Sequence, residues 1–394
     1  MGLTSGGFFA LVIVGVVLLP ALTLLLWGRL PGPKAVKFGS RLGLILMSQA
    51  MAVLLAALWI NNSFQLYYSW SDLMGNNGAT GAIQAATPQV VKTTIAAKGE
   101  GGAHPDSLPN FKLFTQMSGL QDGTGYQVTV TGPESKVTGS VEVWVPPQYS
   151  EAAYKNVDFP VVELFPGTPG TPQTWLTAMQ APLVVSRQVT AGTQHPFVLV
   201  AASINVDGRH DPDCSDIPGG PKVATWLTQD VRNLVLSSFR VAASRGAWGM
   251  MGYSEGGLCA TKLALQYPNL YAAAVSISGD DHPDGDLLKP GTTAYNLNSP
   301  IWLLKHRKPA NVALLLTGTQ QDSDVASEAA AMSRAATSPT SVDTLISQRG
   351  GHNIGVWKSV EPPSFVWLSQ HLTGSSTTTY SALPEMFSGV GLDG

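Results

Sequence analysis

The chain has 394 residues, of which 44% are hydrophobic and 12% are charged, about half of the ~25% charged share of an average globular protein. This composition excludes a disordered or strongly solvated chain. The formal net charge of −3 leaves no basic surplus to neutralise a phosphate backbone, so nucleic acid is excluded as an expected partner. The length fits two or three domains, or one large α/β domain with a smaller element.

Two long uncharged stretches open the chain. Phe8–Trp27 and Leu42–Ile60 each contain about 20 residues, which is the length that a helix needs to cross a bilayer core. We expect both to be membrane-spanning helices. A cleaved signal peptide is an alternative, but it would need a basic segment before the first stretch and a small-residue cleavage site after it. Buried core helices of a soluble protein are a second alternative.

The charges between the two stretches predict their orientation. The connecting segment contains Arg29, Lys34, Lys37 and Arg41 and no acidic residue, whereas the outer flanks carry no charged side chain. The positive-inside rule then places this short loop in the cytoplasm. We therefore expect residues 1–60 to be a two-span anchor in the cell membrane, with everything after residue 60 outside the cytoplasm.

The remainder of the chain shows an α/β pattern. Residues 61–124, rich in Gly, Ala, Thr and Asn, are expected to be an extracytoplasmic linker. Two alternating segments, Gln127–Val130 and Val137–Val145, predict an antiparallel hairpin. Beyond residue 155, short apolar strands alternate with helical segments, which is typical of a mostly parallel sheet flanked by helices. We expect this domain over residues 125–375, followed by a C-terminal tail at 376–394.

The element boundaries follow from the apolar runs and their period. The expected strands are Val161–Phe165, Phe197–Ser203, Trp248–Tyr253, Ala273–Ser278, Val312–Thr317 and Thr344–Gln348. The expected helices are Val223–Arg240, Gly257–Gln266, Val325–Ala336 and Pro363–Leu372.

One pentapeptide points to nucleophilic chemistry. Gly252–Gly256 reads Gly-Tyr-Ser-Glu-Gly and lies between an expected strand and an expected helix. This is the context of a nucleophile elbow, in which glycines allow a sharp turn that exposes the serine hydroxyl. We expect Ser254 to be the nucleophile. An ordinary strand-to-helix turn is the alternative.

A serine nucleophile needs a base and an acid, which follow it in the order serine, acid, histidine in α/β hydrolases. Of the seven histidines, His352 lies latest in a loop after an expected strand, between glycines and an asparagine. Asp322 is the first choice for the acid and Asp324 the second, because both follow the strand Val312–Thr317. The pair Asp280 and Asp281 is a further alternative.

Acyl transfer also needs backbone N–H donors for the oxyanion. One donor is expected from Glu255, which follows the nucleophile, and the other from the loop after Val161–Phe165. In that loop Thr168 is the better candidate, because Pro169 has no N–H.

The chain has two cysteines, Cys214 and Cys259, both in the part that is expected to face an oxidising compartment. A disulfide between them is plausible, with two separate buried thiols as the alternative. The acidic loop that contains both Asp207 and Asp216 matches no metal-binding spacing, so we expect a polar rim of the site and no metal.

Three segments together resemble a known family. The Gly252–Gly257, Arg349–Trp357 and Asp213–Asp216 segments are similar to those of the esterase family of α/β hydrolases that includes esterase D-like enzymes and the antigen 85 mycolyltransferases. The likeness is greatest to membrane-anchored actinobacterial esterases. It implies a triad of Ser254, Asp322 and His352, with the amides of Thr168 and Glu255 as the oxyanion hole. The two-span anchor and an Asp in place of Glu depart from the mycolyltransferases.

These observations predict a membrane-anchored serine esterase that acts outside the cytoplasm on an acyl ester or a lipid-like substrate, without a cofactor. An acyltransferase with the same triad is one alternative, and a catalytically inactive hydrolase fold that serves as a membrane scaffold is another. The segment Asp286–Asn311 is expected either to cap a substrate pocket or to form a surface helix. Oligomeric state is not indicated.

Overall fold

The structure is a computed structural model, and it describes residues 2, 3, 5–64, 67, 70–74, 110–120, 122–206, 208 and 210–374. The expected tail at 376–394, most of the expected linker and Asp207 lie outside these residues. The chain divides into two compact units: residues 1–78 with the loop segments 321–323 and 349–356, and the rest of the chain.

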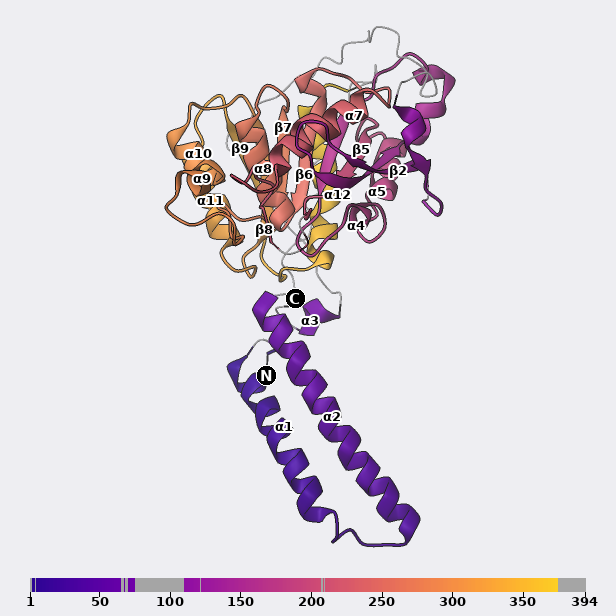
Figure 1. Ribbon diagram of the computed structural model, residues 1–394, viewed down its shortest axis with the longest axis vertical. Coiled ribbons are helices and arrows are strands. Elements are labelled where there is room, and N and C mark those ends of the chain that lie inside the picture. Colours follow the sequence, from indigo (N-terminus) through magenta and orange to yellow (C-terminus); the bar gives the residue numbers. More distant parts are fainter. Residues whose placement is uncertain are drawn as a thin grey trace, which may run out of the picture. The chain divides into compact units, whose positions relative to one another are not determined.

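Two long helices dominate the N-terminal part (Figure 1). They are α1 (Gly6–Leu26) and α2 (Lys34–Phe64), which pack against each other and precede the short α3 (Trp70–Leu73). Segments Gly6–Leu26 and Lys34–Asn62 are long and apolar enough to cross a membrane, and few of their residues are buried. The apolar residues that meet between the helices form a small cluster around Val12 and Leu58.

The second unit is built on a nine-stranded sheet in the order β1-β2-β3-β5-β4-β6-β7-β8-β9. The strands are β1 (Thr115–Gln116), β2 (Thr124–Thr131), β3 (Thr138–Val145), β4 (Val161–Phe165), β5 (Val198–Ala202), β6 (Trp248–Tyr253), β7 (Ala273–Ile277), β8 (Ala313–Thr319) and β9 (Ser341–Ser347). Strands β1, β2 and β3 pair antiparallel with their neighbours, and so does β3 with β5. The strands from β5 through β4, β6, β7 and β8 to β9 pair in parallel. The expected hairpin and the mostly parallel sheet are therefore confirmed.

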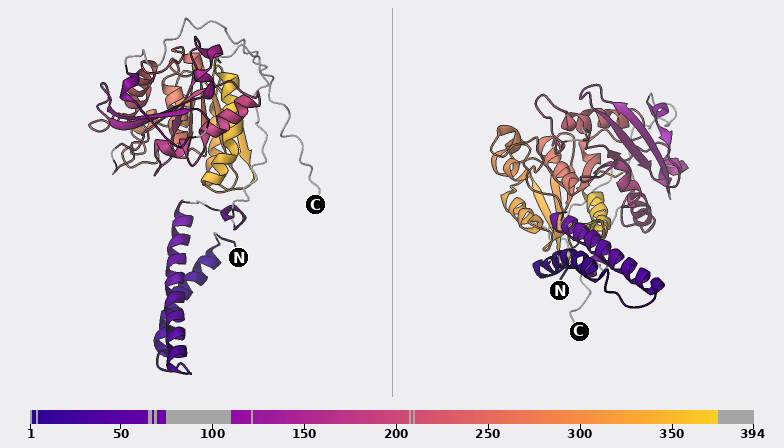
Figure 2. Two further views of the ribbon diagram at one scale, coloured as in Figure 1. Left: turned by 90° about the vertical axis from the view of Figure 1, so that its right-hand side faces the viewer. Right: turned by 60° about the horizontal axis from the view of Figure 1, so that its bottom comes forward.

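Helices cover both faces of this sheet (Figure 2). They are α4 (Pro172–Leu176), α5 (Ala181–Thr190), α6 (Val223–Thr225), η5 (Trp226–Val231), α7 (Arg232–Leu236), α8 (Glu255–Gln266), α9 (Thr293–Leu297), α10 (Pro300–His306), α11 (Val325–Ala335) and α12 (Ile354–His371). Short 3₁₀ turns are η2 (Phe111–Leu113), η3 (Pro147–Ser150), η4 (Ala152–Tyr154) and η6 (Arg245–Ala247).

Two glycines of β6 show why helices can approach this strand from opposite sides. A Cβ on Gly249 would lie 3.0 Å from Leu372, just after α12, whereas a Cβ on Gly252 would collide with the backbone of Gly256 in α8. Because successive strand residues point to opposite faces and these two positions differ by an odd number, α12 and α8 lie on opposite faces. The central strand is thus buried on both sides, which explains its continuous apolar run.

Several sequence predictions need correction. The helix expected at Pro363–Leu372 begins at Ile354 and ends at His371. The helix expected at Val223–Arg240 ends at Leu236 and includes a π-helical turn over Trp226–Val231. Helices α4, α5, α9 and α10 had no predicted counterpart with those bounds. The described part of the expected linker, residues 110–120, contributes η2 and β1, which joins the sheet edge.

Candidate active site

Ser254 lies at the turn between β6 and α8 and has an unusual backbone conformation. Its φ is 56° and its ψ is −128°, a combination that residues with a Cβ rarely adopt. Its N–H donates to the carbonyl of Ile277 at 2.8 Å, which holds the turn against β7. Strained turns of this kind are characteristic of functional positions, and here the strain lifts the serine out of the strand.

The glycines around Ser254 are required by close backbone approaches. A Cβ on Gly252 would lie 1.9 Å from the carbonyl oxygen of Gly256, and one on Gly256 would lie 2.1 Å from that of Phe165. A Cβ on Gly167 would lie 2.8 Å from the Cβ of Ser254. The loop after β4 therefore runs directly beside the serine.

The two expected oxyanion donors are brought to the same place. Glu255 is the first residue of α8, and the first four N–H groups of a helix have no partner within it. Thr168 follows Gly167 in the loop beside Ser254, and its hydroxyl is hydrogen-bonded to the carboxylate of Glu255. The loop after β4 and the first residue of α8 are thus linked directly by this hydrogen bond.

His352 and Asp322 are also brought together. The His352 Nδ1 lies 3.0 Å from Oδ1 and 3.2 Å from Oδ2 of Asp322, and Asp322 is 1% exposed. The two loops that carry these residues are joined further by Gly350, whose N–H donates to the Gln321 side chain at 3.0 Å. An imidazole held through Nδ1 by a buried carboxylate presents its other nitrogen for proton transfer.

The alternative acids have other places in the fold. Asp324 is exposed and precedes α11, where its carbonyl accepts hydrogen bonds from Ser327 and Glu328. Asp281 is buried, and its carboxylate accepts a hydrogen bond from His282 at 2.6 Å. The Asp322 carboxylate, in contrast, is hydrogen-bonded to His352.

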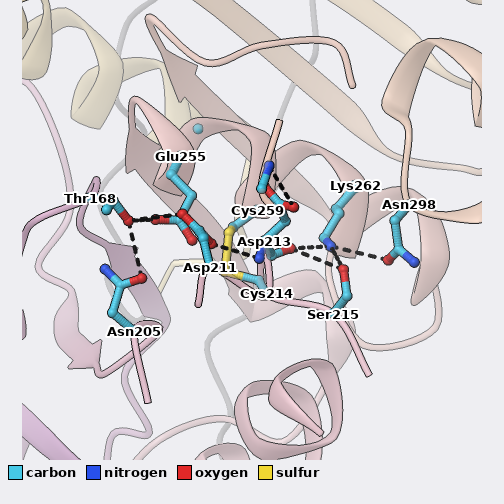
Figure 3. Close-up of a disulfide and its surroundings, with 12 residues drawn as sticks. Thr168, Asn205, Asp211, Asp213, Cys214, Ser215, Glu255, Cys259, Lys262 and Asn298 are labelled. Atoms are coloured by element: carbon cyan, nitrogen blue, oxygen red, sulfur yellow. Dashed lines mark hydrogen bonds between the residues drawn. A yellow bond between two sulfur atoms is a disulfide. The ribbon is translucent and has the colours of Figure 1, made fainter. Parts of the chain in front are cut away.

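The predicted disulfide is present. Cys214 and Cys259 are bonded and fully buried, which ties the loop after β5 to the second turn of α8 (Figure 3). Lys262, one turn further along α8, is fully buried under this loop and donates to Ser215 at 2.5 Å and Asn298 at 3.1 Å. Burial lowers the pKa of Lys262 to about 7.

A group of polar side chains lies beside Ser254 and includes Asp211 of the acidic loop that was expected to rim the site, but the contacts within this group were not predicted. Figure 3 shows Thr168, Asn205, Asp211 and Glu255 converging next to the disulfide. The Thr168 Oγ1 lies 3.1 Å from Asn205 Oδ1 and 3.2 Å from Asp211 Oδ2, in addition to its contact with Glu255. The available sequence signal for this group was Glu255, because a charged side chain that becomes buried needs a polar partner.

A second polar group lies near α9 and α10, in the segment that was expected to form a cap or a surface helix. Helix α10 packs against α8 and α11, and a surface pocket of about 310 Å³ is lined in part by Asp281, His282 and Trp302. Atoms of Asp281, His282 and Glu328 that could ligate a metal lie within 4.8 Å of one another. Because the imidazole is already paired with both carboxylates, we assign no metal to them.

The fold and the turn at Ser254 together define the class of protein as an α/β hydrolase. The family described as "Putative esterase" matches residues 135–355 by its sequence model, and the chain belongs to this family of serine hydrolases.

Individual proteins are similar to this chain in sequence or in fold. An uncharacterized protein of Corynebacterium glutamicum is 26% identical over 294 residues, which are 67% of this chain and 66% of that protein's own length. A ferulic acid esterase is 17% identical, covers 64% of this chain and 99% of its own, and has a TM-score of 0.55. An S-formylglutathione hydrolase from Agrobacterium tumefaciens is 15% identical, covers 66% and 98%, and has a TM-score of 0.56.

Proposed function

We propose that the protein is a membrane-anchored ester hydrolase in which Ser254, His352 and Asp322 form the catalytic triad. The observation that carries this proposal is the strained turn at Ser254 with the β4 loop packed beside it. The topology supports it as well. Strands β6, β8 and β9 belong to one parallel array, so their carboxyl ends lie at one edge, and the three residues follow those ends in order.

The proposed reaction proceeds through an acyl-enzyme. Ser254 Oγ attacks the ester carbonyl while His352 takes the hydroxyl proton, which His352 then returns to the leaving alcohol. Asp322 holds the imidazole through Nδ1 and stabilises its charged form, a role that its 3.0 Å contact and burial support. Water then attacks the acyl-enzyme. Attack by another alcohol would transfer the acyl group instead.

The negative oxygen of the tetrahedral intermediate needs donors that are already in place. We assign this role to the backbone N–H groups of Glu255 and Thr168, which belong to the start of α8 and to the loop beside Ser254. Removing one such donor commonly costs about 3 kcal/mol of transition-state stabilisation.

The anchor is proposed to be the helical pair α1 and α2. Many of their apolar side chains are exposed, among them Leu24 at 78% and Val53 at 69%. An apolar surface of this extent is typical of helices that face lipid. The basic residues between the helices then favour a cytoplasmic loop and a catalytic domain outside the cytoplasm, where the disulfide is stable.

The test is labelling of the full-length protein in membranes by a fluorophosphonate probe, which reacts with activated serines. Labelling is expected for the wild type and is expected to be lost in Ser254→Ala and reduced at least ~100-fold in rate in His352→Ala, as removal of a general base requires. Asp324→Asn is the matched control and should label like the wild type. A folded wild type that takes up no probe would favour the inactive scaffold.

A further inference from the structure

The polar side chains beside Ser254 bring several oxygens close together. The Thr168 hydroxyl has one hydrogen, yet three oxygens surround it, those of Asn205, Asp211 and Glu255 (Figure 3). Two of these oxygens belong to carboxyl groups, and the Asp211 carboxyl is also in hydrogen-bonding contact with that of Glu255. We call these four side chains the carboxylate cluster.

Glu255 is poorly satisfied for a buried acid. It is 6% exposed, and its Oε1 has no hydrogen-bond partner among the residues that the structure describes. Burial and the neighbouring Asp211 raise its pKa well above the usual range. Asp211 is fixed in place, because its Oδ1 accepts the N–H of Asp213 at 2.8 Å while its Oδ2 faces Thr168. A buried carboxyl oxygen that lacks a partner can accept a hydrogen bond from a donor or bind a cation.

The nearby Lys262 does not fill this role. Its Nζ donates to the carbonyl of Asp213 and to Ser215 and Asn298, on the far side of the disulfide from Thr168 (Figure 3). The neighbouring loops carry exposed charges of both signs, among them Asp216, Asp284 and Lys289, and Asp286 is paired with His210 at 2.6 Å. The charge that attracts a cation is therefore that of the cluster itself.

The position of the carboxylate cluster makes its charge consequential for the proposed reaction. Asp211 is in contact with Thr168 and Glu255, the two proposed oxyanion donors, so a carboxylate charge in the cluster acts in the region where the substrate oxygen becomes negative. Like charges in a partly buried site repel by several kcal/mol at short range. A cation seated in the cluster would remove this repulsion and would add attraction to the oxyanion.

We propose that the carboxylate cluster is a cation-binding subsite of the active site, so that a positive group held by Glu255 and Asp211 promotes attack by Ser254. This inference rests on the proposed function. The ligand would be a small cation that binds oxygen atoms. This cation has two sources: an ammonium group on the acyl part of the ester, or a free divalent ion such as Ca²⁺.

The first experiment compares two esters of equal size on the full-length protein. In para-nitrophenyl β-alaninate an ammonium replaces the terminal methyl of para-nitrophenyl butanoate. If the subsite takes the ammonium of the substrate, the wild type should prefer the cationic ester in kcat/KM by about tenfold or more, as a charge-assisted hydrogen bond would give. Asp211→Asn should abolish this preference.

The second experiment tests the metal source without relying on turnover. Thermal unfolding of the full-length protein is measured in EDTA and in millimolar Ca²⁺. If the subsite takes the free ion, Ca²⁺ should raise the Tm of the wild type and should leave the Tm of Asp211→Asn unchanged. Glu255→Gln, which keeps the backbone donor, serves as the second variant should Asp211→Asn fold poorly.

Asp286→Asn is the matched control, because it removes an exposed carboxylate from a neighbouring loop and should retain whichever response the wild type shows. A response in either experiment that depends on Asp211 or Glu255 supports the inference and identifies the source. If the wild type prefers neither ester and Ca²⁺ does not change its Tm, a shared proton suffices and the inference is wrong. Fluorophosphonate labelling in the same preparation separates this result from failure of the proposed function.

Discussion

At the scale of single residues, His282 shows how position couples protonation to folding. Its Nδ1 lies 2.6 Å from Asp281 and 3.7 Å from Glu328. The hydrogen bond to Asp281, followed by the charges of Glu328 and Asp280, outweighs burial and raises the pKa of His282 from 6.5 to about 9. The folded state thus binds this proton more tightly than the unfolded state does.

The sign of the resulting pH dependence follows. A raised folded-state pKa stabilises the fold fully below the unfolded value of 6.5, and this stabilisation is lost as pH rises through about 9. We expect His282→Asn to lower the free energy of unfolding on the acid side of this range by on the order of 1 kcal/mol, since the side chain is partly exposed. Above about pH 9, the difference in free energy of unfolding between variant and wild type should shrink. Urea unfolding at several pH values measures this difference.

The control for this experiment is His306→Asn. The His306 Nδ1 donates to the carbonyl of Trp302 at 3.0 Å instead of to a carboxylate, so this variant removes an imidazole without breaking an ion pair that the structure describes. The same pH-dependent difference in both variants, or a pH-independent difference for His282→Asn, would contradict the coupling.

At the scale of elements, the β-strands were predicted well and the longest C-terminal helix was not. Apolar runs located the strands from β4 to β8 to within two residues, because strands buried on both faces leave a continuous apolar signal. Strand β9, which is only partly buried, was located to within three residues. Helix α12 was expected to start at Pro363, yet it passes through Pro362 and Pro363. Burial of residues such as Phe365 stabilises the helix despite the missing N–H groups.

The start of α12 is fixed by a local signal that was overlooked. The side-chain oxygen of Asn353 accepts the N–H groups of Gly355 at 2.9 Å and Val356 at 3.2 Å, as an N-cap does. Asn353 directly follows His352, so the same loop both starts the helix and carries the proposed base.

The site was predictable only where chain order carries the information. The motif around Ser254 and the order of Asp322 and His352 could be read from the sequence, and the structure joins the last two. The contact between Asp211 and Glu255 could not, because no local pattern links residues so far apart. Their contact depends on the loop after β5, which the disulfide holds against α8.

This disulfide gives a prediction for the element it constrains. Cys214 and Cys259 are 45 residues apart, and closing a loop of that length lowers the entropy of the unfolded chain by an amount worth about 4 kcal/mol. The double variant Cys214→Ala/Cys259→Ala should therefore lose up to that free energy of unfolding. Dithiothreitol should lower the free energy of unfolding of the wild type toward that of the variant and should leave that of the variant unchanged. Equal stability of wild type and variant without reductant would contradict the prediction.

At the scale of the whole molecule, hydropathy separates the chain into two physically different parts. Helices α1 and α2 leave large apolar side chains exposed, whereas the apolar residues of the sheet are buried between two layers of helices. A surface such as that of α1 is unfavourable in water and favourable in lipid. The acidic residues, in contrast, all lie beyond residue 71, in the part proposed to face an aqueous compartment.

The proposed topology can be tested by introducing single cysteines, because both cysteines of the sequence form the disulfide and leave no free thiol to react. A single new cysteine then reports its own location to a maleimide that does not cross membranes. In intact cells, Lys289→Cys in the catalytic domain should be labelled, and Gly28→Cys between α1 and α2 should be labelled only after the membrane is opened. The reverse pattern would place the domain in the cytoplasm, where glutathione would oppose the disulfide, so topology and redox state must agree for the proposal to stand.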